Sequence, residues 1–343
     1  MMSRRPSALQ GLRGAVTVIG IGAILVAIGY YTALATVLAE SKAVSTSVYR
    51  SGEGDDRIAI IPVEGMITPD TAKFVHHAVE AAIHDESVKA VVLRVESGGG
   101  FVAPSEQIYA ELRRLRQRRE IPVVASFGGI AASGGYYVGC ATEHIYAEPT
   151  GLTGSIGVMA TIMDVNGLLE ERLRIQPHVI TATTSPQKDL ANDVFEGWDK
   201  GAEEGEDGVG EDTREALRIL DAMHQRFVHV VREAREPKMT SEAIAEATRG
   251  GVYMAEDAAE VKLIDEVGYL EDALAKARDL ARISEDRPET IIYQPRVSLM
   301  EQLTGMGRRS ARGVNLNIDP AELRRHLIEF SRPQLMYWCN LGV

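Results

Sequence analysis

Short apolar runs alternate with helical patterns in the first half of the chain. Residues 57–63 (RIAIIPV), 88–95 (VKAVVLRV) and 121–126 (IPVVAS) are almost continuous apolar runs, typical of strands that are buried on both faces. Between them, residues 69–84 and 105–116 repeat apolar residues at helical spacing, which predicts two helices. Strands that alternate with helices indicate an α/β fold with a mainly parallel sheet.

The second half of the chain is predicted to be mainly helical. Residues 213–235 predict one long helix. The stretch at 197–210 is acidic and glycine-rich, which predicts an exposed loop. The alternative, a cation site, is not favoured because the spacing fits no calcium-binding loop. Further helices are predicted over 165–172, 242–247, 255–261 and 270–281, and short strands near residues 145 and 156 and over 178–182.

The N-terminal region contains an apolar run without a charge, residues 15–38, which is long enough to cross a bilayer as a helix. Arg4, Arg5 and Arg13 precede it, so the positive-inside rule predicts a cytoplasmic N-terminus with the rest of the chain outside. The alternative is a cleaved signal peptide that uses the small residues at 33–35. The run is longer than the apolar region of most signal peptides, which favours a retained anchor.

Composition excludes several classes of function. The formal charge of −12 argues against a nucleic-acid partner. Cys140 and Cys339 are too few and too distant for a disulfide framework, and we interpret them as small buried hydrophobic residues. No HExxH motif is present, and the histidines do not cluster with carboxylates at ligand spacing, so no metal site is predicted. No phosphate-binding loop is present either, and no cofactor is expected.

Two glycine-rich turns follow predicted strands, where ligands gather in parallel sheets. They are Ser97-Gly98-Gly99-Gly100 and Ala131-Ala132-Ser133-Gly134-Gly135. A serine followed by two glycines at the start of a helix is a candidate nucleophile beside an amide that can bind an oxyanion. The alternative is that Ser133 only caps its helix, and the turn by itself favours that simpler interpretation.

A wider set of motifs resembles the signal peptide peptidase A family. The matching segments stand in the right order, over roughly residues 57–277, and the first departs from the pattern because Gly98 stands where proline is usual. The resemblance implies a Clp-protease/crotonase-like α/β domain of repeated ββα units behind one N-terminal transmembrane helix. The matching segments are Glu96–Gly100 (ESGGG), Ala132–Tyr137 (ASGGYY), Thr153–Val158 (TGSIGV), and the pair Arg249–Tyr253 (RGGVY) and Ala258–Gly268 (AAEVKLIDEVG).

A serine hydroxyl needs a base to remove its proton. His144 and His178 lie at predicted strand starts, and we interpret both as structural. The resemblance implies instead a lysine about fifty residues after the serine, and Lys188 is the only lysine between Lys89 and Lys200. In Ser-Lys enzymes, burial lowers the pKa of this lysine so that it is neutral near pH 7. Lys200 lies in the acidic loop, where neighbouring carboxylates would raise its pKa rather than lower it.

The resemblance also assigns the rest of the site. Ser133 is the nucleophile and Lys188 the general base. Ser155 matches the serine that orients the lysine. The amides of Gly100 and Gly134 match the oxyanion hole, with Gly99 as a near alternative.

The implied function is a membrane-anchored serine endopeptidase that degrades cleaved signal peptides or other apolar peptides near the membrane. The implied assembly is a homo-oligomeric ring with active sites shared between subunits, because in double-length family members the lysine and the serine lie in different repeats. Two alternatives stay open, a crotonase-like acyl-CoA enzyme and a non-catalytic membrane scaffold of the same fold. The expected segments are a cytoplasmic N-terminus (1–14), the transmembrane helix (15–38), a linker (39–56), the Ser-Lys peptidase domain (57–285) and a C-terminal extension (286–343).

Overall fold

The computed structural model describes residues 22, 24, 26–31, 44–161, 211–296 and 334–338. The predicted membrane-spanning segment lies mostly outside these residues, and within them no helix is long and apolar enough to cross a bilayer. The helix predicted at 165–172, the strand at 178–182 and the loop at 197–210 also lie outside the described residues.

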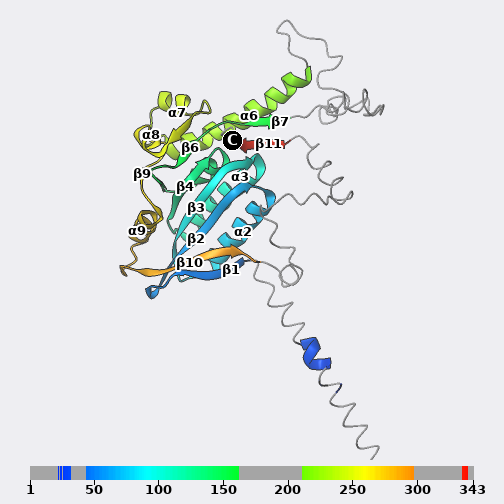
Figure 1. The fold of residues 1–343 in the computed structure, drawn as a ribbon, viewed down its shortest axis with the longest axis vertical. Coiled ribbons are helices and arrows are strands. Elements are labelled where there is room, and N and C mark those ends of the chain that lie inside the picture. The colour runs from blue at the N-terminus through cyan, green and yellow to red at the C-terminus, as the bar shows by residue number, and fades with distance from the viewer. Residues whose placement is uncertain are drawn as a thin grey trace, which may run out of the picture.

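One sheet with a parallel centre organises the described part of the chain (Figure 1). Its strand order is β1-β10-β2-β3-β4-β5-β9, and only the β1–β10 pairing along this path is antiparallel. Short strands attach at the ends of the long ones: β6 pairs with β4 and β8, while β11 pairs with β3 and β7. The strands are β1 (Val44–Arg50), β2 (Glu53–Ile67), β3 (Val88–Phe101), β4 (Val123–Ala132), β5 (His144–Ala147), β6 (Leu152–Gly154), β7 (Met159–Thr161), β8 (Val252–Met254), β9 (Glu266–Val267), β10 (Pro288–Pro295) and β11 (Gln334–Trp338).

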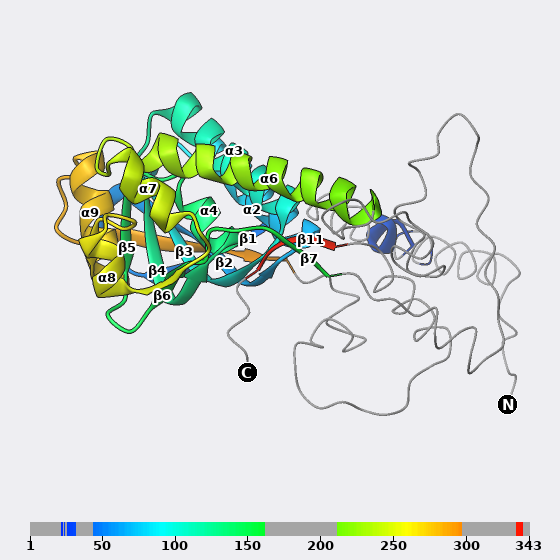
Figure 2. The ribbon, with the colours of Figure 1, turned by 90° about the horizontal axis from the view of Figure 1, so that it is seen from above.

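Helices cover both faces of the sheet, so two apolar cores form. Alternate strand residues such as Ala59 and Ile61 face a large core with α2, α3, α4 and α6, whereas Ile58 and Ile60 face a smaller core under α9. Figure 2 shows α3 and α6 together along one side of the sheet. This two-sided burial explains why the central strands are continuous apolar runs. The helices are α2 (Pro69–His84), α3 (Val102–Arg119), α4 (Gly134–Gly139), α6 (Glu211–Arg235), α7 (Ser241–Ala247), α8 (Ala255–Glu260) and α9 (Leu270–Ala281).

The long central strands bend before their helices begin. The β2–β3 register shifts between Glu64 and Met66, and the β3–β4 register shifts between Val95 and Ser97. Along β4, pairing passes from β5 to β6 after Phe127. Bulges of this kind turn a strand and end its first pairing. Each of these strands is followed by a helix, which confirms the predicted α/β class.

Most predicted elements match the structure, and α2 is the clearest case. The helix begins at Pro69 after Thr68, whose side chain accepts a hydrogen bond from the amide of Thr71 in a capping box. Several strands were not predicted, and two of them are long: β1 lies in the expected linker, and β10 lies in the expected C-terminal extension. Both pair within the main sheet, with β10 between β1 and β2.

Candidate active site

Ser133 lies where β4 ends and α4 begins, at the carboxyl end of a central strand. Its backbone has φ 53° and ψ −116°, a conformation that costs free energy for a residue with a side chain. Two main-chain hydrogen bonds hold it there. Its amide donates to the Gly154 carbonyl at 2.8 Å, and its carbonyl accepts from the Tyr137 amide at 2.9 Å.

The hydroxyl of Ser133 does not cap the helix. Although Ser133 occupies the N-cap position of α4, its side chain makes no capping hydrogen bond. The residue is 1% exposed, and its Oγ has no hydrogen-bond partner among the described residues. A buried hydroxyl without a partner costs about 1–3 kcal/mol, so its presence here needs an explanation other than stability. The capping interpretation therefore does not account for this serine.

The turn after β3 approaches Ser133 from the neighbouring strand. Ser97 is buried, and its hydroxyl donates to the Gly65 carbonyl at 2.5 Å. The same oxygen accepts a hydrogen bond from the Gly99 amide at 3.0 Å. Ser97 therefore fixes the turn, and it already uses the Gly99 amide. Of the three predicted oxyanion donors, this leaves Gly100 and Gly134 as the better candidates.

Gly134 lies directly against this turn. A Cβ atom added to Gly134 would lie 2.7 Å from Ser105 Oγ, 3.2 Å from Gly99 Cα and 3.3 Å from Gly100 N. No side chain fits at the first of these distances without displacing its neighbours, so only glycine allows the two turns to meet. The structure thus brings Gly134 and the Gly99–Gly100 turn together, and their role as oxyanion donors stays a prediction.

Ser155 follows β6, which continues the sheet beside the end of β4. The β4–β6 register pairs Ala132 with Gly154, the residues just before Ser133 and Ser155. Ser155 has φ 49°, and its amide donates to the Gly251 carbonyl at 2.7 Å. Two serines with strained backbones therefore end two adjacent strands. Lys188, the predicted base, lies outside the described residues.

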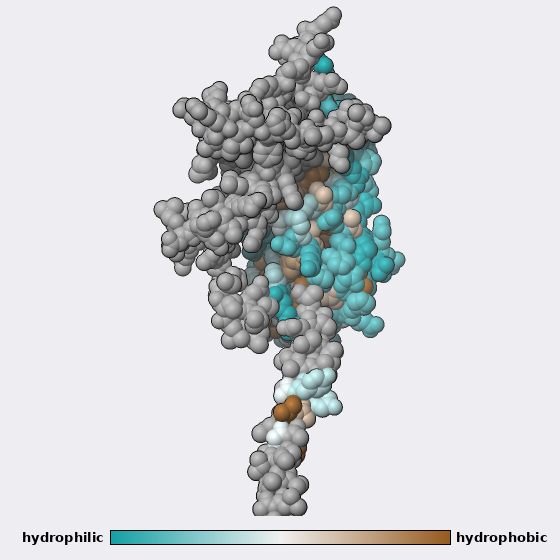
Figure 3. All heavy atoms as spheres, turned by 90° about the vertical axis from the view of Figure 1, so that its right-hand side faces the viewer, coloured by the Kyte–Doolittle hydropathy of each residue, from teal (hydrophilic) through white to brown (hydrophobic). Residues whose placement is uncertain are grey.

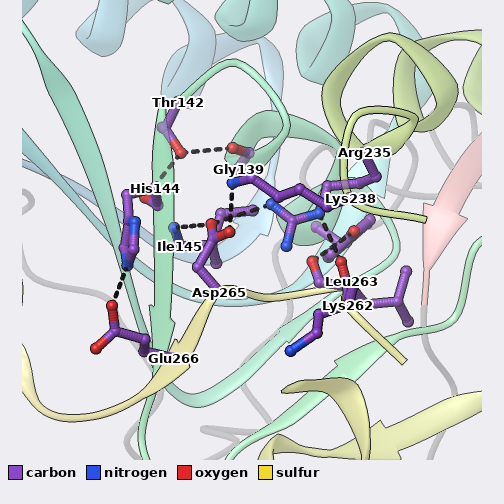
Figure 4. Close-up of polar contacts among 11 residues, drawn as sticks. Gly139, Thr142, His144, Ile145, Arg235, Lys238, Lys262, Leu263, Asp265 and Glu266 are labelled. Carbon is purple, nitrogen blue, oxygen red and sulfur yellow. Dashed lines mark hydrogen bonds and ion pairs between the residues drawn. The ribbon is translucent and has the colours of Figure 1, made fainter. Parts of the chain in front are cut away.

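A buried polar network behind α4 was not predicted. The Tyr136 hydroxyl donates to the Leu263 carbonyl at 2.8 Å and ties α4 to the segment before β9. Asp265 in that segment accepts from the Ile145 amide at 2.8 Å and from Arg235 Nη1 at 3.1 Å, and it also pairs with Lys238 (Figure 4). Nothing in local periodicity reveals such partners, although Tyr136 and Asp265 both lie in matched motifs.

Charge and burial determine the protonation states in this network. Burial alone would raise the pKa of Asp265, but the Arg235 charge and the hydrogen bonds from Lys238, Arg235 and Ile145 outweigh it and lower that pKa. Nearby Cys140 is buried, and burial raises the pKa of its thiol to about 12, so the thiol stays protonated and unreactive.

His144 and its partner Glu266 are the sequence neighbours of Ile145 and Asp265, which belong to this network. Its Nε2 lies 3.1 Å from Glu266 Oε1, and burial lowers the pKa of its imidazole. These contacts favour the structural interpretation of His144. His178, the other histidine weighed as a base, lies outside the described residues.

Comparison with known proteins identifies relatives of this chain. The profile of peptidase family S49 matches residues 115–284. The "Putative protease slr0021" of Synechocystis sp. is 31% identical over 249 residues, covering 73% of this chain and 83% of that protein. Protease 4 of Salmonella typhi is 35% identical over 227 residues, covering 65% of this chain but 34% of that protein. This chain therefore spans about a third of the length of Protease 4.

Similar solved structures include a membrane-bound stomatin-specific protease in complex with a substrate peptide. Its TM-score is 0.43 at 14% identity, and the match covers 73% of this chain and 97% of that one. A ClpP1 variant from Listeria monocytogenes gives a TM-score of 0.40 at 15% identity, with 63% and 94% covered. The profile match and the 31% identity over most of the Synechocystis protein carry the assignment. The chain belongs to peptidase family S49, which supports the Clp-protease-like α/β fold predicted for it.

Proposed function

We propose that this chain is a serine endopeptidase with Ser133 as nucleophile and Lys188 as general base. The observation that carries the proposal is the state of Ser133, which is strained and buried and makes no capping bond. The next residue along the chain, Gly134, lies against the glycine turn at Gly99–Gly100. A structure that keeps such a costly arrangement is typical of a functional site.

The reaction begins with proton transfer. Lys188 Nζ takes the proton of Ser133 Oγ, with Ser155 orienting the lysine, and Oγ forms a bond to the carbonyl carbon of the peptide. The carbonyl oxygen becomes an oxyanion, and the amides of Gly100 and Gly134 donate to it. The C–N bond then breaks, and the amine leaves with the proton from Lys188. Water hydrolyses the acyl-enzyme by the same steps and regenerates the serine.

Two alternatives fit the site less well. A crotonase-like acyl-CoA enzyme could use the glycine amides for a thioester oxyanion, but it would not need a strained serine beside them. A non-catalytic scaffold would require Ser133 only as a helix cap, and its hydroxyl makes no such bond. Neither alternative explains why Ser133 Oγ is buried without a partner among the described residues.

A fluorophosphonate probe tests the proposed chemistry directly. We expect the wild-type protein to be labelled at Ser133, at a rate that rises with pH as the basic lysine becomes neutral. The Lys188→Ala and Lys188→Arg proteins should both be labelled at least about 100-fold more slowly than wild type. Alanine has no basic group, and arginine stays protonated and cannot act as a base. Mass spectrometry of the labelled peptide measures both the site and the rate. Rapid labelling of Lys188→Arg would assign the base to another residue, such as Lys200 or His178.

We propose that the substrates are released signal peptides or other extended apolar peptides near the membrane. In the same proposal, residues 15–38 form a single-pass membrane anchor with the catalytic domain on the extracytoplasmic side. Ile24, Val26 and Ile28 support the anchor, because each is more than half exposed. Figure 3 shows apolar atoms in this stretch below the globular part. Recovery of the full-length chain in the soluble fraction after cell lysis would contradict the anchor.

We also propose a homo-oligomeric ring in which Ser133 and Lys188 of one site come from different subunits. The family resemblance supports the idea, since in double-length family members the lysine and the serine of a site lie in different repeats. Mixing inactive Ser133→Ala and Lys188→Ala proteins should restore about a quarter of wild-type activity for random pairing across one interface. Absence of recovery after demonstrated subunit exchange would place both residues in one chain.

A further inference from the structure

The C-terminal strand β11 lies between two strand ends that belong to the candidate site. It pairs antiparallel with the end of β3, where Trp338 is in register with Gly99 and Tyr337 with Gly100. On its other edge, it pairs antiparallel with β7 (Figure 1). Met336 is the residue in register with both neighbours, Phe101 of β3 and Met159 of β7.

Both edges of this position connect directly to residues of the proposed mechanism. The β3 edge is the Gly99–Gly100 turn itself, and β7 begins four residues after Ser155. Strand β11 also contacts α4, which begins immediately after Ser133, and α3. A chain that lies between β3 and β7 therefore runs past the nucleophile and the oxyanion turn. We call this position, bounded by residues 99–101 and 159–161, the strand slot.

The strand slot has the form that an extended peptide requires. Addition of a strand to a sheet edge gives affinity through main-chain hydrogen bonds, and these are independent of the peptide's sequence. Here two edges are available, so a bound chain can pair on both sides. In this structure the occupant is the chain's own residues 334–338.

From this geometry we infer that residues 334–338 are a tethered competitor that occupies the peptide-binding position of the active site. The inference rests on the proposed peptidase function and adds a means of regulation to it. Substrate must displace β11 before it can pair with Gly99–Phe101. Because the competitor is part of the same chain, its local concentration does not fall when the protein is diluted.

The size of the effect follows from the fraction of molecules whose slot is free. If the tail leaves the slot open one-tenth of the time, the apparent affinity for a peptide falls about tenfold. Release of the tail should therefore lower the apparent Kd or KM while leaving the chemical step unchanged. This separates a competitor from a residue that takes part in catalysis.

Proline substitution at Met336 tests the inference with little other change. Met336→Pro removes the backbone N–H of the residue in register with both neighbouring strands, whereas Met336→Ala keeps that N–H and is the matched control. Deletion of residues 334–343 provides a second way to empty the slot. All three changes are made in the full-length Ser133→Ala protein, so that binding is measured without hydrolysis.

The probe is a fluorescein-labelled synthetic peptide that copies residues 334–343, and its Kd is measured by fluorescence anisotropy. We expect the Met336→Pro and deletion proteins to bind it about tenfold more tightly than the Met336→Ala and parent proteins. Equal Kd values in all four proteins would overturn the inference. So would loss of the cooperative thermal transition in both Met336→Pro and the deletion protein, since β11 would then be a permanent part of the fold.

The outcome is separable from the test of the proposed function. Absence of fluorophosphonate labelling at Ser133 would contradict the peptidase proposal, whatever the anisotropy shows. Normal labelling together with equal Kd values would contradict only the tethered competitor.

Discussion

Replacement of Ser133 by alanine is expected to abolish peptide hydrolysis, lowering kcat on the order of 10⁵-fold to 10⁶-fold, as loss of a nucleophile does. The fold should not lose stability. Ser133 Oγ makes no hydrogen bond among the described residues, and alanine keeps the main-chain bonds to Gly154 and Tyr137. We expect the free energy of unfolding to rise by up to about 1–3 kcal/mol, because the substitution removes a buried hydroxyl without a partner. Steady-state hydrolysis of a fluorogenic peptide and thermal denaturation measure the two effects.

Ser126 provides a matched control on the same strand. It is also buried, but its hydroxyl accepts a hydrogen bond from Arg94 Nη1 at 3.0 Å. Ser126→Ala should cost about 1–3 kcal/mol, because the bond goes to a charged group, while kcat stays close to wild type. The two serines should thus show opposite effects on activity and stability. A Ser133→Ala protein that still cleaves peptides at a near wild-type rate would refute the assignment of the nucleophile.

Asp265→Asn is expected to give the largest loss of stability among the described ion pairs, about 3–5 kcal/mol. The side chain of its partner Arg235 is 3% exposed, so removal of the carboxylate leaves a buried guanidinium without its counter-charge. The amide oxygen of asparagine can still accept the hydrogen bonds from Ile145 and Arg235, but the negative charge is lost. Chemical denaturation near pH 7 measures the loss.

An exposed aspartate serves as the control for this prediction. Asp279 pairs with Arg278, but its side chain is 62% exposed, so Asp279→Asn should change stability by less than about 1 kcal/mol. If Asp265→Asn and Asp279→Asn lower the free energy of unfolding equally, the buried ion pair contributes no more to stability than the exposed one.

The loss in Asp265→Asn should also depend on pH. The pKa of Asp265 in the folded protein lies below its ordinary value of 3.8. A carboxylate of this kind contributes its full stability above the unfolded pKa and loses it as the pH falls through the folded pKa. The difference in stability between wild type and Asp265→Asn should therefore be constant above about pH 5 and narrow below about pH 4. A difference that stays unchanged down to pH 3 would contradict the assignment of the ionised state.

The sequence predicted those elements whose signals are local. Helix α2 begins at the expected residue because Thr68 and Pro69 specify its start, and α9 matches its predicted range because its apolar face is regular. Strands β1 and β10 were missed for a physical reason. Much of β1 is exposed, and β10 begins and ends with proline, so neither has the pattern of a central strand. Their pairing joins opposite ends of the domain, which no local window contains.

The same distinction holds for the site. Motifs mark Ser133, Gly134 and Ser155 in the sequence, and their roles stay predictions; the structure adds that Gly134 packs too closely against Ser105 and Gly99 for a side chain to fit without displacing them. The role of Ser97 in fixing the Gly99 amide was not found, since it depends on a contact with Gly65 across two strands. The link from Tyr136 to Leu263 was missed for the same reason, because it joins residues 127 positions apart. The place of Lys188 relative to Ser133 remains a prediction from the sequence.

The position of β10 between β1 and β2 has a consequence for biosynthesis. Strand β2 emerges early from the ribosome, but its partner on one side, residues 288–295, is made after most of the domain. Until then that edge of β2 has no strand of the main sheet beside it, and β1 has no partner at all in the path β1-β10-β2. Unpaired apolar edges promote aggregation, and pairings this distant in sequence form slowly. The nascent domain therefore depends on residues 288–295 to close this edge of the sheet, and a chain released before residue 295 keeps an unpaired edge that promotes aggregation.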